Sequence, residues 1–216
     1  MTDIVARLAT FSTSAISDAL DRLSIHGQAG DIRPLAPGMR LAGRAFTGLY
    51  QPVDVFGGTV GDYVDDVPPG AVVVLDNAGR LDATVWGDIL TMVAHRRGLA
   101  GTVVNGVCRD GDRATELGYP IFSRARWMRT GKGRVSLVSV DVPVTLGHVR
   151  VHPADIVIGD GDGVVVVPAG HEDRVAAAAQ EITDAEDEIR RDVENGFRLD
   201  EARARRGYFH LQAPPT

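Results

Sequence analysis

The chain has 216 residues, 44% of them hydrophobic and 24% charged, with a formal net charge of −6 and a pI near 5.5. This composition indicates a globular chain of one domain and disfavours nucleic-acid binding, which usually requires a basic stripe. The single cysteine, Cys108, excludes an internal disulfide and a cysteine-based zinc site. The longest apolar runs, Ala71–Leu75 and Gly163–Val167, are too short to cross a membrane. We therefore expect a cytoplasmic protein without a membrane or nucleic-acid partner.

The first part of the chain predicts a helix and a strand on either side of a loop. Residues 12–14 can cap a helix whose apolar side chains recur at helical spacing. These side chains are Ile16, Ala19, Leu20 and Leu23. Ile32–Arg40 holds two prolines and is predicted to be a connecting loop. Leu41–Tyr50 is predicted to be a strand, and the acidic, glycine-rich residues 54–66 to contain at most a short helix.

The middle of the chain alternates strand and helix. Ala71–Leu75 is a continuous β-branched run of the kind found in strands that are buried on both faces. Gly87–Arg97 is predicted to be a helix that is capped by Asp88 and ended by Gly98. Thr102–Val107 is predicted to be a second buried strand, and residues 121–122 to begin a third. This order is typical of an α/β domain with a parallel sheet.

The last part of the chain predicts two hairpins and a long helix. In residues 135–140 and 143–151 apolar and polar side chains alternate, as in the two strands of a hairpin. Residues 155–159 and 164–167 are predicted to be the strands of a second hairpin, on either side of its turn. His171–Asn195 carries apolar residues at helical intervals, and Gly196 is predicted to stop this helix as its C′ residue. We therefore predict a single α/β domain with a C-terminal helical arm, residues 171–216.

Asp88 and the pair Arg109–Asp110 are the candidate functional residues, and twenty residues separate them. Asp88 stands at the start of the predicted helix, where unpaired backbone amides and the helix dipole favour an anion. The amides of Ile89 and Leu90, which follow Gly87 and Asp88, could hold a substrate carboxylate. An acid beside such an anion requires a cation, which a metal ion would supply.

Arg109 and Asp110 follow a predicted strand at its carboxyl end, where ligands bind in open α/β sheets. The Arg109 guanidinium suits carboxylate or enolate oxygens, and Asp110 offers a hard oxygen ligand for Mg²⁺. Two interpretations remain open for these residues alone. They form either a site for a metal and an oxo acid, or a helix cap beside a surface ion pair.

Several blocks along the chain together resemble the RraA-like family, which includes 4-hydroxy-4-methyl-2-oxoglutarate and 4-carboxy-4-hydroxy-2-oxoadipate aldolases. The blocks are Ser17–Asp21, Gly43–Thr47, Trp86-Gly87-Asp88, Val107–Asp110, Tyr119–Phe122, Asp141–Val144 and Gly159–Pro168. The third and fourth of these blocks, Trp86-Gly87-Asp88 and Val107–Asp110, are similar with their spacing to the family's D-x20-R-D signature. The resemblance covers nearly the whole chain, with residues 1–170 as the catalytic domain. It implies a β/β/α sandwich like the phosphohistidine swivelling domain.

The resemblance also implies roles for the residues that match the signature. In the aldolases the metal is Mg²⁺ or Mn²⁺, held directly by the acid that matches Asp110 and through a bound water by the acid that matches Asp88. The arginine that matches Arg109 contacts the keto oxygen of pyruvate. The amides that match Ile89 and Leu90 hold the pyruvate carboxylate.

The resemblance implies a homotrimer or a hexamer with sites between subunits. A further metal-site acid comes from the C-terminal helix of a neighbouring chain, and Glu186 is the best match, with Glu188 as the alternative. Asn105 departs from the family, since many relatives carry aspartate before the following glycine. This departure and the unusual tail leave the substrate open.

The function we predict is a metal-dependent lyase that cleaves a carbon–carbon bond of a 2-oxo acid through a pyruvate enolate. Retro-aldol cleavage and oxaloacetate decarboxylation share this enolate, and both remain candidates. The alternative is a protein-binding regulator, because the family's namesake binds and inhibits ribonuclease E.

Two other motifs are given structural interpretations. Cys108 is predicted to be a small buried side chain rather than an activated thiolate. The sequence Asp160-Gly161-Asp162-Gly163 hints at calcium but lacks the later ligands of an EF-hand loop, so a tight hairpin turn is predicted there.

Overall fold

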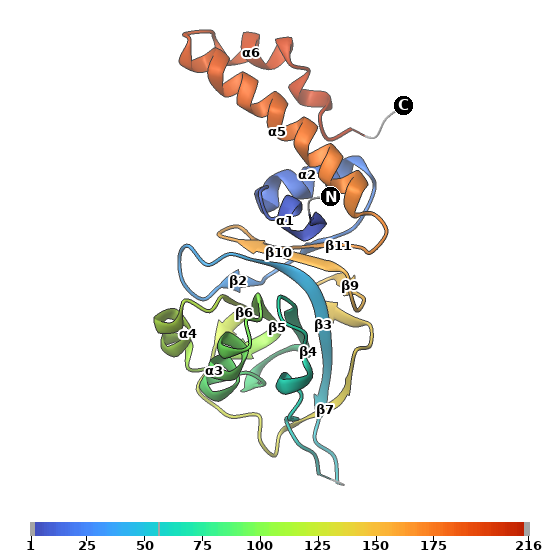
Figure 1. The fold of residues 1–216 in the computed structure, drawn as a ribbon, viewed down its shortest axis with the longest axis vertical. Helices are drawn as coiled ribbons and strands as arrows, with labels where there is room; N and C mark the ends of the chain where they lie inside the picture. The colour runs from blue at the N-terminus through green and yellow to red at the C-terminus, as the bar shows by residue number, and fades with distance from the viewer. Residues whose placement is uncertain (1–2, 56, 214–216) are drawn as a thin grey trace.

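Four parallel strands form the centre of the structure, a computed structural model that describes residues 3–55 and 57–213 (Figure 1). They lie side by side in chain order as β3 (Leu41–Pro52), β4 (Val72–Thr84), β5 (Gly101–Cys108) and β6 (Ile121–Arg126). Each neighbouring pair is parallel. Every residue of β5 is buried, which explains its nearly unbroken apolar sequence. The predicted α/β organisation is therefore confirmed.

Antiparallel strands extend this sheet at both sides. β10 (Ile156–Asp160) pairs with β3 and forms the predicted hairpin with β11 (Gly163–Val167). β1 (Gln28–Ala29) pairs with β11, and β2 (Arg33–Pro34) pairs with β6 at the far end. Because β1 and β2 end the sheet on opposite sides and yet follow each other in the chain, the sheet must curl back on itself.

The region after β6 corrects one prediction. β7 (Val135–Val140) is not the partner of the strand that follows it, but pairs antiparallel with β3. The hairpin is formed instead by β8 (Val144–Leu146) and β9 (Val149–Val151) alone. An alternating sequence fixes which side chains share a face but not which strand lies alongside, and this is why the pairing was mispredicted.

Three apolar clusters hold the layers together. Inside the curl, the β8–β9 hairpin packs on valines of β4, β5, β10 and β11. On the outer face of the parallel strands lie α3 (Asp88–Arg96) and α4 (Gly111–Leu117). The β10–β11 hairpin is covered by α1 (Ile4–Leu8), α2 (Thr13–Arg22) and the first half of α5 (Glu172–Glu194).

The C-terminal arm consists of the second half of α5 and the returning helix α6 (Leu199–Arg205), and it projects from the body (Figure 1). The amides of Gly196 and Phe197 donate to the carbonyls of Val193 and Asp192, and Gly196 has a φ of +90°. These bonds form a Schellman motif, so the predicted C′ glycine is confirmed. Two 3₁₀ turns, η1 (Val64–Asp66) and η2 (Tyr208–His210), complete the elements.

Two further boundaries differ from prediction. The loop predicted at Ile32–Arg40 contains β2, and β4 continues nine residues past Leu75, to Thr84, with shifts in its register after Asp76 and Arg80. In the described part of the chain, no helix combines the length and apolarity needed to cross a membrane. The likeness to the phosphohistidine swivelling domain and the packing of the arm on a neighbouring subunit stay predictions, and Pro214-Pro215 lies outside the described residues.

Candidate active site

The ends of β4 and β5 bring the predicted functional residues to one edge of the sheet. Both strands run in the same direction, so the segments that follow their carboxyl ends meet. The amide of Arg109 donates to the carbonyl of Trp86 across 3.1 Å, which joins the two segments directly. The Trp86 indole is buried against Tyr119, and its Nε1 donates to Oγ1 of Thr91 in α3 at 2.9 Å. These contacts fix the start of α3 beside the end of β5.

Gly87, not Asp88, is the N-cap of α3, which corrects the predicted helix start. Gly87 has no side chain with which to cap the helix, and Asp88 is the first helical residue. A Cβ atom added at Gly87 would lie 3.1 Å from both Arg109 Nε and Asp110 Oδ2. The absence of a side chain therefore lets the Arg109–Asp110 pair approach the helix terminus.

The Asp110 carboxylate caps α3 in place of an N-cap side chain. Its Oδ2 accepts a hydrogen bond from the Asp88 amide at 3.2 Å and lies 3.3 Å from Arg109 Nε. Asp110 has a φ of +57°, in the left-handed region that residues other than glycine seldom adopt. A conformation of this kind costs free energy and recurs at functional sites. Here it accompanies a carboxylate that bonds to the neighbouring helix instead of to its own helix, α4.

A pocket of about 190 Å³ opens at this edge of the sheet. Five predicted residues line it: Gly87, Asp88, Ile89, Leu90 and Arg109. The rest of its wall consists of residues 60–62, 84–86 and 130–132, and of these the sequence singled out only Trp86, in the block Trp86-Gly87-Asp88. One signal for the last segment was present, since Lys132 is the chain's only lysine and stands between two glycines.

Glu186 and Glu188 are not brought to this pocket within one chain. Both lie on α5, which packs on α2, and Figure 1 shows α5 and α3 at opposite ends of the molecule. The Glu186 carboxylate pairs with Arg190 at 2.7 Å, and the Glu188 carboxylate pairs with Arg206. Whether either acid completes the pocket of a neighbouring chain stays a prediction.

The residues of the site fit a hard divalent cation better than zinc. Among residues 3–55 and 57–213, no three His, Cys, Asp or Glu side chains are grouped so that they could hold a metal ion. Mg²⁺ usually keeps several waters and takes only one or two protein carboxylates, which Asp88 and Asp110 can supply. Structural zinc requires four protein ligands.

Cys108, which precedes Arg109, contributes no reactive thiolate. Its side chain is buried, and its sulfur lies 3.5 Å from Ser123 Oγ. Burial raises the pKa of the Cys108 thiol above its usual value, outweighing the hydrogen bond to Ser123. The predicted small buried side chain is confirmed.

Two curated relatives are similar to most of the chain. Protein DlpA of Legionella pneumophila is 35% identical over 206 residues, which cover 94% of this chain but 34% of DlpA. The chain thus spans about a third of that relative. A Halalkalibacterium halodurans protein named "Putative 4-hydroxy-4-methyl-2-oxoglutarate aldolase" is 33% identical over 188 residues, which cover 87% of each chain.

Two solved structures share the fold. An uncharacterized protein from Pseudomonas syringae pv. tomato matches with a TM-score of 0.87 and 40% identity over 93% of this chain and 96% of its own. Streptomyces coelicolor RraAS2, described as an unusual member of the RNase ES inhibitor RraA family, matches with a TM-score of 0.80 and 28% identity over 87% and 95%. The family model for RraA-like proteins, Aldolase/RraA, matches residues 13–166. The chain therefore belongs to the RraA-like family.

Proposed function

We propose that the protein is a divalent-metal-dependent lyase that cleaves a carbon–carbon bond of a 2-oxo acid through a pyruvate enolate. The observation that carries this proposal is the convergence of Arg109 and Asp110 on the amino terminus of α3, beside a pocket. The name of the H. halodurans relative supports the same chemistry. The reaction is retro-aldol cleavage, oxaloacetate decarboxylation or both.

The chain's own groups account for substrate binding. The first amides of a helix have no acceptor within it, so those of Ile89 and Leu90 can donate to the carboxylate of the pyruvyl unit. Gly87 adds no side chain of its own at this helix terminus, which leaves room for Arg109 and Asp110 beside these amides. The Arg109 guanidinium, which is half-exposed at the pocket, would donate to the keto oxygen as negative charge develops there.

Asp110 and Asp88 would hold Mg²⁺ or Mn²⁺, with Glu186 of a neighbouring chain as a third acid in a homotrimer or hexamer. When bound, the ion acts as a Lewis acid that stabilises the enolate charge. Asp88 lines the pocket and is exposed, so it can accept or return a proton through solvent.

The test is pyruvate release from oxaloacetate and from 4-hydroxy-4-methyl-2-oxoglutarate, with Mg²⁺ and with chelator. We expect chelator-sensitive turnover, and we expect Asp110→Asn to lower kcat/KM at least about a hundredfold, because a neutral amide is a poor ligand for Mg²⁺. Asp112→Asn is the matched control, since Asp112 lies two residues away, is exposed and pairs with Arg126 alone among residues 3–55 and 57–213. Full metal-dependent activity in Asp110→Asn would refute the assignment.

The same experiment separates the enzyme from a regulator. RraAS2 resembles this chain and is described as belonging to a family of ribonuclease inhibitors. The regulator would be favoured by two results together. The wild-type protein would turn over neither substrate, and the wild-type protein and the Asp110→Ala variant would bind a ribonuclease of the E type with equal affinity. We expect instead that Asp110→Ala loses turnover.

A further inference from the structure

The hydroxyl of Thr91 lies one helical turn from the start of α3, and the roles proposed above do not use it. Thr91 is fully buried. Its Oγ1 donates to the carbonyl of Gly87, four residues earlier, at 2.9 Å, and its backbone amide donates to the same carbonyl at 3.0 Å. Two donors of one residue therefore hold the carbonyl of the N-cap residue.

The hydrogen bond from the Thr91 hydroxyl to Gly87 has a fixed direction. Oγ1 accepts a hydrogen bond from Nε1 of Trp86 at 2.9 Å, and an indole nitrogen can only donate. A threonine hydroxyl has one hydrogen, which is then left for the Gly87 carbonyl. Because both side chains are buried, solvent offers neither group another partner. The hydroxyl thus links a buried indole to the carbonyl at the start of α3.

The Gly87 carbonyl and the Asp88 amide belong to one peptide unit, and the amide binds Asp110. A peptide unit is planar, so a rotation that moves its oxygen also moves its N–H. The Asp88 amide donates to Asp110 Oδ2 at 3.2 Å. Hydrogen bonds accepted by the carbonyl polarise the unit and strengthen its amide as a donor. The unit is therefore held at its oxygen by Thr91 and at its nitrogen by Asp110.

Gly87 is the reason that this peptide unit needs a restraint from outside. A residue without a Cβ atom restricts the rotation of the adjoining peptide units less than other residues do. The side chain that Gly87 lacks would also press on Arg109 and Asp110. The Thr91 hydroxyl supplies the missing restraint from the buried side of the helix, and Thr91 does not line the pocket.

The orientation of the Asp110 carboxylate depends on this amide. The Asp88 amide and Arg109 Nε, at 3.2 and 3.3 Å, both contact the same oxygen, Oδ2. The carboxylate makes no capping hydrogen bond to its own helix, α4. A displacement of the Asp88 amide would therefore rotate the carboxylate that the proposed function assigns to the metal.

The neighbouring helix has the same local hydrogen bond without these consequences. In α4, Thr115 Oγ1 donates to the Gly111 carbonyl at 3.0 Å, again across four residues. Bonds of this kind recur within helices, and Thr115 is exposed, so water can replace this one. Thr91 differs in being buried, in accepting from an indole and in holding a peptide unit that ends on a candidate metal ligand.

We propose that Thr91 is a positioning residue of the active site, whose hydroxyl orients the Gly87–Asp88 peptide unit and through it the Asp110 carboxylate. The catalytic consequence rests on the proposed function, because Asp110 is there assigned to the metal. The geometric part, a restrained Asp88 amide, is independent of the reaction. The two parts are therefore tested by separate measurements.

The geometric part is tested by the exchange of amide hydrogens with solvent, followed by NMR on the full chain without metal. Thr91→Val keeps the shape of the side chain and removes its hydroxyl. We expect the Asp88 amide to exchange about tenfold faster than in the wild type, because its hydrogen bond to Asp110 opens more readily. Thr47→Val is the matched control and should leave this rate unchanged. Thr47 is a fully buried residue of β3 whose hydroxyl donates to the Val142 carbonyl at 2.6 Å.

The catalytic part is tested by pyruvate release at a temperature where all variants are folded. Thr91→Val should lower kcat/KM about tenfold or more, and raise the Mg²⁺ concentration that gives half-maximal activity by a similar factor, because Asp110 is displaced. Thr91→Ser, which keeps the hydroxyl, should restore most of both values. A residue that only stabilises the fold would change neither value under these conditions, and Thr47→Val shows this behaviour.

An Asp88 amide that exchanges at the wild-type rate in Thr91→Val would overturn the positioning role. Wild-type kcat/KM and Mg²⁺ dependence in an active Thr91→Val protein would overturn it as well. If the wild-type protein releases no pyruvate, the proposed lyase fails, whereas faster Asp88 exchange in Thr91→Val still supports the orientation of the peptide unit. Thr91→Ala, which favours the helix, takes the place of Thr91→Val if that variant does not fold.

Discussion

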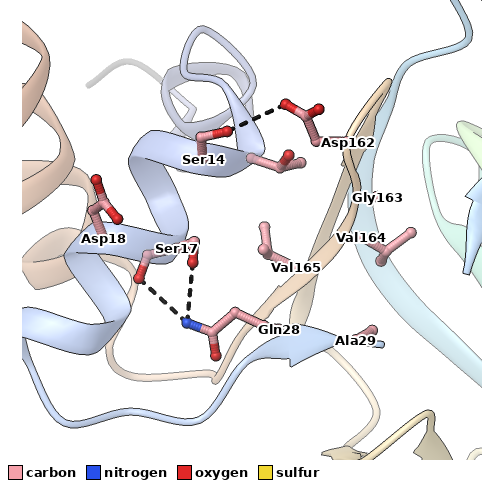
Figure 2. Close-up of a pocket in the computed structure, with 10 residues that line it drawn as sticks. Ser14, Ser17, Asp18, Gln28, Ala29, Asp162, Gly163, Val164 and Val165 are labelled. Atoms are coloured by element: carbon pink, nitrogen blue, oxygen red, sulfur yellow. Dashed lines mark hydrogen bonds between the residues drawn. The ribbon is translucent and has the colours of Figure 1, made fainter. Parts of the chain in front are cut away.

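Two of the polar hollows that lie beside helix starts differ in how their polar groups are used. The larger, about 290 Å³, lies between α2 and the β1–β11 edge (Figure 2). In it, Ser14 Oγ donates to Asp162 at 3.2 Å, and the side-chain nitrogen of Gln28, Nε2, donates to both the hydroxyl and the backbone carbonyl of Ser17. Asp18 accepts a hydrogen bond from Gln212. These groups bind one another, so the hollow is part of the structure that joins α2 to the sheet.

The smaller hollow, at the start of α3, has the opposite character. Asp110 adopts a left-handed backbone conformation to cap a helix that is not its own, Gly87 leaves space where a side chain would stand, and Lys132 has no ion-pair partner in the described chain. The volume of a hollow therefore does not distinguish a binding site from a structural hollow. A binding site is distinguished by polar groups that the fold leaves free for a ligand.

The strongest test of this contrast is Gly87→Ala. The new methyl group would press on Arg109 Nε and Asp110 Oδ2, each 3.1 Å away, and displace them by a few tenths of an ångström. The backbone φ of −152° suits alanine, so stability should fall by no more than about 1 kcal/mol. Turnover should fall by about tenfold to a hundredfold, because catalysis is sensitive to small displacements.

Gly161→Ala provides the control for this measurement, since a Cβ atom there meets no other atom within 4 Å. Steady-state kinetics and thermal unfolding of both variants, measured side by side, separate the two effects. Wild-type kcat/KM in Gly87→Ala would mean that the close approach of Arg109 and Asp110 does not matter to catalysis.

The matching change beside the larger hollow should affect stability and not turnover. Asp160 is almost fully buried and accepts hydrogen bonds from Thr13 Oγ1 at 2.6 Å and from the Thr13 amide at 2.8 Å. Asp160→Asn replaces one acceptor oxygen with a donor, and it should lower the free energy of unfolding at pH 7 by about 1–3 kcal/mol. Activity at a temperature where both proteins are folded should be unchanged. Asp162→Asn, at the exposed side of the same turn, is the control.

The effect of Asp160→Asn should depend on pH. Burial acts to raise the pKa of Asp160, but the hydrogen bonds from the Thr13 side chain and from the amides of Thr13 and Asp162 outweigh it and hold the pKa below its usual value. The carboxylate therefore stabilises the fold fully above its unfolded pKa of about 4, and this contribution is lost as the pH falls through the lower folded value. Urea unfolding from pH 7 to pH 3 should show the variant and the wild type converging. A constant difference would contradict the assignment.

The sequence predicted the hollow at the start of α3 better than the hollow beside α2, because residues of the former follow the ends of neighbouring strands. Gly87, Asp88 and Arg109 follow two neighbouring parallel strands, and parallel strands bring their carboxyl ends to one edge whatever the rest of the fold. The segments 60–62 and 130–132 reach the same pocket through contacts with β7 and β4 that no local pattern specifies. The capping of α3 by Asp110 could not be predicted for the same reason, since the donor and the acceptor are twenty-two positions apart in the sequence.

The smallest expected effect is that of Ser14→Ala. The hydrogen bond from Ser14 to Asp162 is exposed, and water can replace either partner when the hydroxyl is removed. We expect the free energy of unfolding to change by less than about 0.5 kcal/mol and turnover to stay at the wild-type value. A large loss of turnover without a loss of stability would show that Ser14 contacts a ligand. The hollow in Figure 2 would then be a second site, and hydrogen bonds within the chain could no longer be used to tell a structural hollow from a functional one.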